Sequence, residues 1–104
     1  MNSPIMLEIK IGGNSIIYPQ DLSKLLNKIA KILPAEGNEP IIINGRLPVW
    51  VFSALTYWFY HRPWIATYEP REIKGVVVGS RIADVSIGDL IEIKEIKKIY
   101  VEYP

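Results

Sequence analysis

The feature of this sequence that most constrains its fold is a continuous apolar run at residues 40–43, Pro-Ile-Ile-Ile. The run shows no alternation between apolar and polar residues, which is typical of a strand covered on both faces. A long apolar helical pattern follows at residues 47–61, and a second strand that the sequence predicts to be buried follows at residues 64–68. This strand-helix-strand order predicts two parallel strands joined by a right-handed crossover. The fold class that we expect is therefore α/β.

The remaining segments complete the predicted sheet. Residues 6–11 alternate apolar and charged side chains, and a Gly-Gly-Asn turn leads to a short apolar stretch at residues 15–18, which predicts an N-terminal β-hairpin. Residues 22–33 carry apolar side chains three and four positions apart, which predicts an amphipathic helix. Further strands are predicted at residues 74–80, 90–96 and 99–103. We expect one domain over residues 1–104, with a mixed sheet and two helices.

The composition limits the possible partners. A formal net charge of +1 is too small for a protein that coats duplex nucleic acid, so we expect no DNA partner and only a small, locally held anion. The chain has no cysteine, which excludes disulfides and thiolate metal sites. No signal-peptide pattern precedes residue 18, and the apolar stretch at residues 47–60 is too short to cross a bilayer. We therefore expect a cytoplasmic protein without a membrane partner.

The predicted helix at residues 47–61 is apolar nearly all the way round. Trp50 and Tyr57 lie on one side of the helical pattern, whereas Val51 and Trp58 lie on another. A surface helix of a monomer normally has a polar side, so both faces should be covered. One face can pack on the sheet, and the other then needs a second chain. We expect a homodimer.

Two turns are candidates for the functional site. Asn44-Gly45-Arg46 follows the first parallel strand and precedes the helix, and Glu69-Pro70-Arg71 follows the second parallel strand. Ligands of α/β sheets gather beyond the carboxyl ends of parallel strands. Gly45 would let an anion approach the backbone, the amides of the first helical turn would donate to it, and Arg46 would add a forked cation. The sequence therefore predicts an anion site, and with it a phosphate-rich nucleotide.

Each of these residues also has a purely structural interpretation. Asn-Gly is an ordinary turn, and Glu69 and Arg71 could form a surface salt bridge. His61, the only histidine, could cap the end of the helix. The side chains of Tyr57, Tyr60 and His61 share a helix face and could stack on a base or form a protein interface. One histidine and one glutamate do not supply three metal ligands, so we expect no metal site within one chain.

Three stretches resemble a known family. They are residues 43–50 (INGRLPVW), 61–71 (HRPWIATYEPR) and 75–78 (GVVV), and with the Gly-Asp turn at residue 88 the similarity covers about residues 40–95. Together they resemble the small CRISPR-associated ring nuclease of the Csx-three type. The resemblance implies a small Rossmann-like domain related to the CARF domains, which sense cyclic oligoadenylates in type III CRISPR defence.

The resemblance also implies a function. Proteins of this type are dimers that bind cyclic tetra-adenylate between two stacked dimers and linearise it, with manganese as a possible cofactor. Gly45, Arg46 and Arg71 match the family's binding residues by position, and we expect Asn44, Tyr57 and Tyr60 to bind the ligand as well. His61, Glu69 and Arg71 are our candidates for catalysis. The family usually has Asp at the position of Glu69, several histidines near the helix end, and a histidine where this chain has Arg81. The metal-binding residues therefore diverge from the family pattern.

Two other functions stay open on the sequence. A non-catalytic module could bind a nucleotide as a sensor, or dock a protein partner on its aromatic helix. A metal-dependent exonuclease acting on RNA ends would need a divalent metal and a linear substrate, which the small net charge and missing ligands disfavour.

Overall fold

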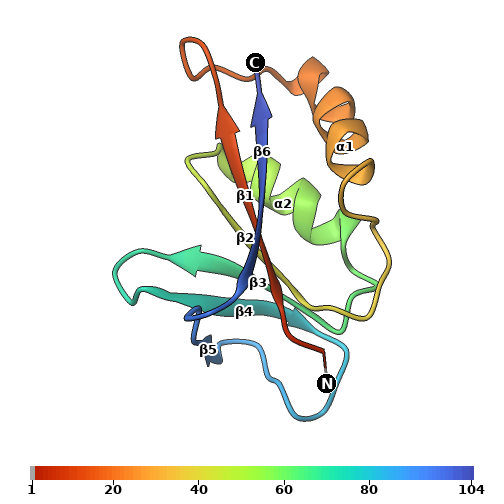
Figure 1. Cartoon of the computed structure of the whole chain (residues 1–104), viewed down its shortest axis with the longest axis vertical. Coiled ribbons are helices and arrows are strands. Elements are labelled where there is room, and N and C mark those ends of the chain that lie inside the picture. Colours follow the sequence, from red (N-terminus) through yellow and green to blue (C-terminus); the bar gives the residue numbers. More distant parts are fainter. Residues whose placement is uncertain (1) are drawn as a thin grey trace.

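A six-stranded mixed sheet forms the centre of the fold (Figure 1), and the computed structural model describes residues 2–104. Its strands are β1 (Ile5–Ile11), β2 (Ile41–Gly45), β3 (Trp64–Glu69), β4 (Lys74–Ser80), β5 (Leu90–Ile91) and β6 (Lys97–Tyr103). Their order across the sheet is β5-β4-β3-β2-β1-β6. The strands β3, β2, β1 and β6 run parallel, whereas β4 and β5 are antiparallel to their neighbours. The α/β class and the mixed sheet with two helices are confirmed.

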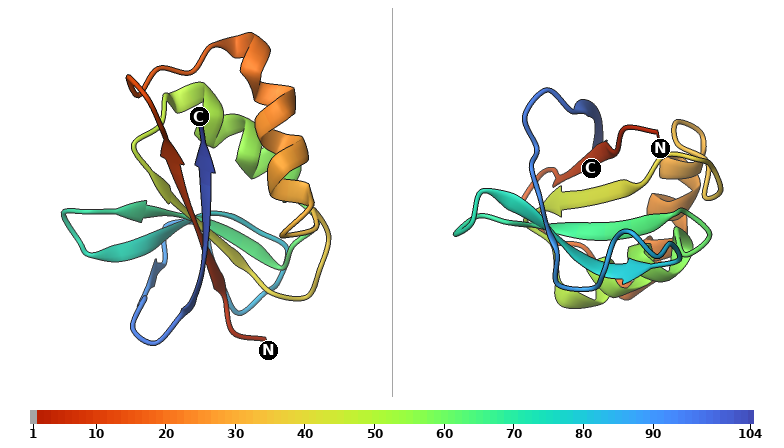
Figure 2. Two further views of the ribbon diagram at one scale, coloured as in Figure 1. Left: turned by 45° about the horizontal axis from the view of Figure 1, so that its top comes forward. Right: turned by 90° about the horizontal axis from the view of Figure 1, so that it is seen from below.

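Both α-helices cover one face of this sheet (Figures 1 and 2). A short 3-10 helix, η1 (Pro19–Asp21), leads into α1 (Leu22–Ala30), and α2 (Val49–Trp58) links β2 to β3. Leu25 and Ile29 of α1 pack in the same buried cluster as Val51 and Leu55 of α2. We call this side of the sheet the helix face and the other side the open face.

The apolar run at residues 41–43 is buried on both faces, as its lack of alternation predicts. Ile41 and Ile43 belong to the core on the helix face, whereas Ile42 belongs to a second cluster on the open face. The segment at residues 81–96 covers part of the open face, and Ile82 and Ile91 pack against that second cluster. Trp64, which is 3% exposed, is a core residue there.

The predicted strand-helix-strand unit is confirmed, because β2 and β3 pair in parallel from Ile41↔Ile65 to Ile43↔Thr67. Its helix is shorter than the pattern at residues 47–61 suggested. After Trp58 the chain makes tight turns, in which the Tyr60 N–H donates to the carbonyl of Tyr57 at 3.2 Å. These turns bring the chain back to the start of β3.

The predicted N-terminal hairpin is wrong. Both edges of β1 are occupied by parallel strands, β2 on one side and β6 on the other, so no edge is left for a return strand. Ser15 begins the predicted return with a positive φ of 63°. Residues 15–18 instead cross the end of the sheet as a loop, from which Ile17 packs into the core.

The strand predicted at residues 90–96 is also mostly wrong, because only Leu90–Ile91 pairs in the sheet. The apolar side chains of Ile93 and Ile96 pack against the open-face cluster from a loop. These side chains therefore contribute to the core, although their backbone does not pair with another strand.

The outer side of α2 is open to solvent in this chain. Val49 is 78% exposed, Tyr57 77% and Tyr60 48%. One copy of the chain therefore does not cover both sides of α2, as the sequence led us to expect. The homodimer that would cover the outer side stays a prediction. Among residues 2–104, neither α1 nor α2 has the length that a membrane-spanning helix needs.

Candidate functional site

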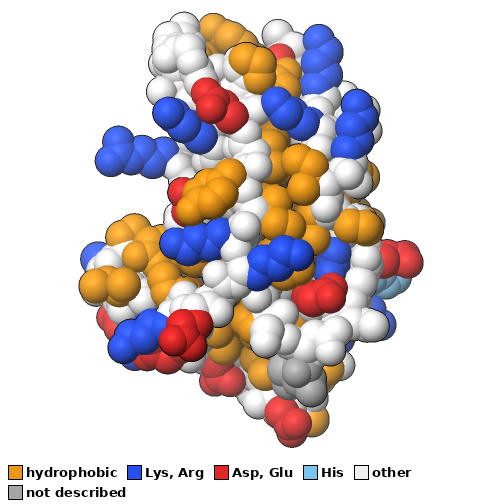
Figure 3. Space-filling view, in the orientation of Figure 1, with side chains coloured by type: hydrophobic (Ala, Val, Ile, Leu, Met, Phe, Trp, Pro, Cys, Tyr) orange, Lys and Arg blue, Asp and Glu red, His pale blue; other side chains and the backbone are white. Residues whose placement is uncertain are grey.

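A hollow of about 740 Å³ lies on the open face, where β1, β2 and β6 end. We call it the sheet-face pocket. Its walls come from three strands and the turns that follow them, and its lining residues are Glu8, Ile9, Lys10, Ile11, Ser15, Asn44, Gly45, Arg46, Pro70, Tyr100, Val101 and Glu102. Figure 3 shows basic and acidic side chains intermingled over β1 and β6. The first predicted turn, Asn44-Gly45-Arg46, therefore lines a cavity together with Pro70 of the second turn.

Asn44 is held in the wall of this pocket by neighbours on β1. Its amide Nδ2 donates to Glu8 Oε1 at 3.3 Å and lies 3.9 Å from the sulfur of Met6. Because β1 and β2 are in register with Glu8 opposite Asn44, the two side chains meet on the same face. This contact holds the amide nitrogen and leaves the side-chain carbonyl oxygen available as an acceptor.

Gly45 is required by the backbone of β1. Its φ is +150°, a conformation that side chains rarely adopt, and a Cβ there would overlap the carbonyl oxygen of Ile9. The backbone of Gly45 thus lies close to the backbone of the neighbouring strand β1, whereas the sequence predicted a close approach to an anion. It also lets β2 turn sharply toward Pro48, the N-cap of α2.

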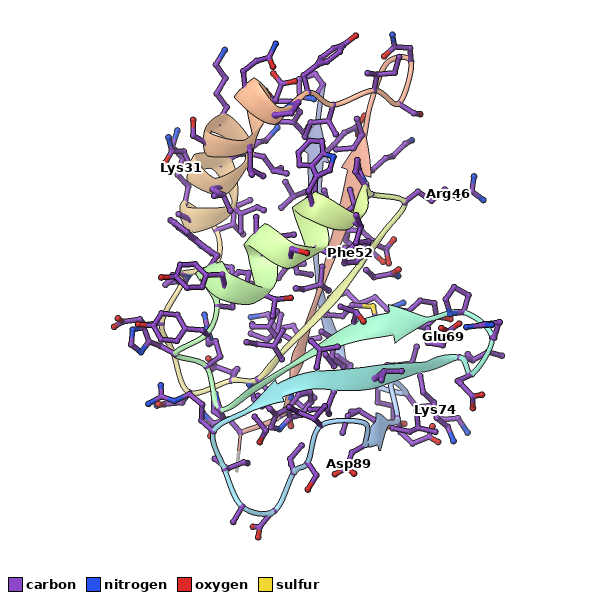
Figure 4. The ribbon with its side chains drawn as sticks, turned by 180° about the vertical axis from the view of Figure 1, so that it is seen from behind. Lys31, Arg46, Phe52, Glu69, Lys74 and Asp89 are labelled. Carbon is purple, nitrogen blue, oxygen red and sulfur yellow. The ribbon has the colours of Figure 1, made fainter. Side chains whose placement is uncertain are left out.

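Arg46 is exposed and extends away from the sheet beyond the end of β2 (Figure 4). Arg46 and Lys10 of β1 both line the sheet-face pocket. The two cations share the pocket with the carboxylates of Glu8 and Glu102. The lining of this pocket therefore carries two positive and two negative side chains. Arg46 is the one that could bind a phosphate through two parallel N–H donors.

Glu69 and Arg71 pair with each other at the tip of the β3-β4 hairpin. Arg71 Nε lies 3.1 Å from Glu69 Oε2, its Nη2 lies 3.2 Å from Oε1, and its backbone N–H donates to Oε2 at 2.9 Å. These bonds hold the pKa of the Glu69 carboxyl below its usual range. They also raise the pKa of Arg71. Arg71 is 88% exposed, so the guanidinium is available to an anion that competes with Glu69.

Tyr57 and Tyr60 line a different hollow, of about 450 Å³, between α2 and β4. Their rings are stacked with centroids 5.5 Å apart and an interplanar angle of 17°. The aromatic side chains are neighbours as predicted, but Tyr60 and His61 lie in the turns after α2 and not on a helix face. Ser53 and Thr56 of α2, with Gly79 and Ser80 of β4, complete most of this helix-β4 pocket.

His61 continues the aromatic row, with its ring centroid 4.0 Å from that of Tyr60. Arg81 is a donor only, and its Nη1 lies 3.3 Å from His61 Nδ1, so Nδ1 accepts and the ring proton belongs on Nε2. Nε2 faces Glu36 Oε1 at 3.8 Å. The imidazole is thus oriented between a cation and a carboxylate on the surface.

The predicted site residues fall into three places within one chain. Asn44, Gly45 and Arg46 line the sheet-face pocket, Glu69 and Arg71 form the hairpin pair, and the aromatic row with His61 borders the helix-β4 pocket. His61 precedes the start of β3 and Glu69 is its last residue. Six strand residues span roughly 20 Å, so one chain does not bring these two groups to the same phosphate.

The β1 and β6 walls of the sheet-face pocket were not predicted from the sequence. Glu8, Lys10, Tyr100 and Glu102 all line it. The alternation in residues 6–11 and 99–103 was a usable signal, because it puts these polar side chains on one face. It was missed because no local pattern shows that the first and last strands are neighbours.

The sequence also gave no hint that Arg62 is buried, with 1% of its surface exposed. Its guanidinium donates to the carbonyls of Pro34, Ala35 and Glu39, and its Nη1 lies 3.2 Å from Glu39 Oε1. Burial lowers the pKa of Arg62, and the Glu39 carboxylate opposes that shift. Arg62 therefore stabilises the loop between α1 and β2.

Manganese does not fit the residues of a single chain. Within residues 2–104, no three His, Asp or Glu side chains are grouped so that they could hold a metal ion. We therefore derive no step through a metal.

Comparison with known proteins decides the family. Residues 10–92 match the family described as CRISPR-associated protein (Cas_csx3). The chain belongs to this family. The Cas_csx3 match includes all three places described above, whereas β6, with Tyr100 and Glu102, lies outside it.

A curated relative is also similar. Over 76 residues the chain is 29% identical to an "Uncharacterized protein" of Aquifex aeolicus (strain VF5). The alignment covers 73% of this Cas_csx3 chain and 68% of that protein.

Proposed function

We propose that the protein binds cyclic tetra-adenylate, a second messenger of type III CRISPR defence, and linearises it. The proposal rests on membership of the CRISPR-associated Cas_csx3 family together with one observation, the sheet-face pocket that Arg46 and Pro70 share. It carries the further expectation of a distant relation to the Rossmann-like domains that sense cyclic oligoadenylates.

The pocket suits part of such a ligand. A guanidinium and an ammonium, from Arg46 and Lys10, can neutralise phosphate, and the exposed ring of Tyr100 can stack on a base. A volume of about 740 Å³ lies in the range for drug-sized molecules. A ring of four nucleotides is larger, so the ligand would need the same surface from a second copy. A symmetric homodimer would supply each cation twice, and such dimers could stack around the ligand.

Cleavage would follow from positioning. In-line attack by a ribose 2′-hydroxyl forms the 2′-oxygen–phosphorus bond and breaks the bond to the 5′-oxygen, leaving a 2′,3′-cyclic phosphate. The hydroxyl proton leaves with a base, and the 5′-oxygen takes a proton. His61 and Glu69 are the candidates for these transfers, and their separation along β3 requires that they come from different copies. Arg71 would stabilise the developing charge on the phosphate.

The test compares matched charge-loss variants. Arg46→Ala combined with Arg71→Ala should weaken binding of cyclic tetra-adenylate at least tenfold, whereas Lys31→Ala, which removes an exposed cation from the end of α1, should leave it unchanged. Chromatography of the products then separates turnover from binding. A wild-type protein that binds the ring without converting it would be a sensor or a sink, and equal affinity in all variants would refute the assigned site.

One observation favours a second function, a protein-docking module. The outer side of α2 exposes Val49 and Tyr57, and the turn after it exposes Tyr60. Under this alternative the two arginine substitutions would change little, whereas Tyr57→Ser would abolish partner binding.

A further inference from the structure

Strand β6 forms one edge of the sheet and is bonded on one side only. It pairs with β1 in an unbroken parallel register from Ile5↔Lys97 to Ile11↔Tyr103. In Figure 1 it lies in front of the other elements, and the right-hand view of Figure 2 shows it at one end of the stack of strands. Its seven residues contain no proline and no bulge, two of the devices that protect an edge from pairing, although Lys97 and Lys98 supply a third, charge.

The hydrogen bonds at its end show which backbone groups face outward. The carbonyl of Tyr103 accepts from the Gly12 N–H at 2.7 Å, so it points inward to the β1 side. The carbonyl of Glu102 accepts from the ammonium of Lys28 on α1, so it points to the free edge. Because both main-chain groups of a residue in a parallel strand point to one side and alternate along the chain, Lys98 and Tyr100 also face outward.

The sequence of β6 is complementary to itself when reversed about Tyr100. In an antiparallel pair centred there, Lys98 lies opposite Glu102, Ile99 lies opposite Val101, and Tyr100 lies opposite itself. The charged pair and the tyrosines are on the open face, where Tyr100 and Glu102 line the sheet-face pocket. Ile99 and Val101 are on the helix face, in the main core. Each pair is thus of a type that stabilises neighbouring strands.

We propose that β6 pairs antiparallel with β6 of a second copy, about a twofold axis at Tyr100, so that the two six-stranded sheets become one. The outward N–H and C=O of Tyr100 would bond to the same residue of the other copy. The Lys98 N–H would bond to the Glu102 carbonyl of the other copy, which has a second lone pair beside Lys28. Tyr100, 64% exposed in one copy, would lie beside the same residue of the other copy at the seam.

This edge is better suited to a second copy than to an unrelated peptide. An unrelated strand would have no reason to place Glu opposite Lys98 and Lys opposite Glu102, whereas a copy of this chain does both at once. The axis is perpendicular to the joined sheet, so both sheet-face pockets would lie on the same side of it. The proposal does not depend on which ligand these pockets bind.

A charge exchange tests the pairing. Sedimentation of the wild type at micromolar concentration should show a dimer. Lys98→Glu and Glu102→Lys, taken singly, each place like charges opposite one another twice and should weaken dimerisation at least tenfold. The double variant should restore it. Lys94→Glu makes the same charge change on an exposed loop residue before β6 and should have no effect.

A crosslink provides a measurement that does not depend on the charges. The chain has no cysteine, and residues opposite each other in a hydrogen-bonded antiparallel pair have Cα atoms about 5.5 Å apart, within disulfide reach. Tyr100→Cys should therefore oxidise to a covalent dimer much faster than Lys94→Cys. A monomeric wild type, no rescue in the double variant with slow crosslinking at position 100, or a dimer that only Tyr57→Ser dissociates would overturn the proposal.

Discussion

Arg62 holds Glu39 through two contacts, with its Nη1 3.1 Å from the backbone carbonyl and 3.2 Å from the carboxylate oxygen Oε1. The same guanidinium lies 5.8 Å from the centre of the Phe59 ring. A buried cation is stable only when its donors are satisfied, and here carbonyls of the loop between α1 and β2 satisfy them. The relationship ties the turn before β3 to the loop before β2, so it fixes the start of both parallel strands.

Arg62→Ala should lower the free energy of unfolding by about 3 kcal/mol, because it removes the charged donor that three carbonyls of the loop between α1 and β2 share. Arg62→Lys should recover only part of this, since one ammonium cannot reproduce a forked set of bonds. Urea unfolding followed by circular dichroism measures both. A loss below about 1 kcal/mol for the alanine variant would show that the loop does not depend on this cation.

Gly37→Ala tests the packing of the Arg62 guanidinium against the backbone of the loop between α1 and β2. A Cβ at this position would lie 2.7 Å from Cζ of Arg62, so the guanidinium would have to move. We expect destabilisation in the wild type and almost none in an Arg62→Ala background, which is the non-additivity that a direct contact produces. Equal effects in both backgrounds would argue against the contact.

Gly45→Ala should destabilise the protein by about 2 kcal/mol or more, because both the positive φ and the contact with the Ile9 carbonyl exclude a side chain. Gly79→Ala is the matched control, since a Cβ there meets nothing within 4 Å and the residue has no positive φ. Thermal unfolding of the two variants should separate them clearly. Similar melting temperatures would contradict the assigned role of Gly45.

The Glu69 carboxyl should titrate below the value of about 4.3 for an unperturbed glutamate, because Arg71 hydrogen-bonds its charged form. A lowered folded-state pKa means that the pair stabilises the protein above the unfolded-state pKa. That contribution fades as the pH falls through the folded-state pKa. NMR titration of the side-chain carbon reports the value, and Arg71→Ala should raise it. A Glu69 pKa that does not respond to Arg71→Ala would show that the pair is not formed in solution.

The sequence predicted the central part of this fold well, because the pattern at residues 40–68 is dictated by burial on both faces of β2 and β3. The hairpin was mispredicted because strand alternation in residues 6–11 indicates a half-exposed strand without naming its neighbours. The neighbours are β2 and β6, about 35 and 90 residues away along the chain, and pairing at that separation has no local pattern.

The candidate site also has a part that could be predicted from the sequence and a part that could not. Asn44-Gly45-Arg46 and Pro70 could be placed at one rim from the parallel-strand rule alone. The β6 wall with Tyr100 could not, because it depends on that distant pairing. The burial of Arg62 was also out of reach, since an arginine in a turn is ordinarily exposed.

A crystal structure with cyclic tetra-adenylate tests the central claim most directly. The account predicts phosphate oxygens about 2.7–2.9 Å from the Arg46 guanidinium, the distance of a charge-assisted hydrogen bond, with the ring lying over the sheet-face pockets of two copies. A ring bound only against Tyr57 and Tyr60, with Arg46 left in solvent, would contradict it.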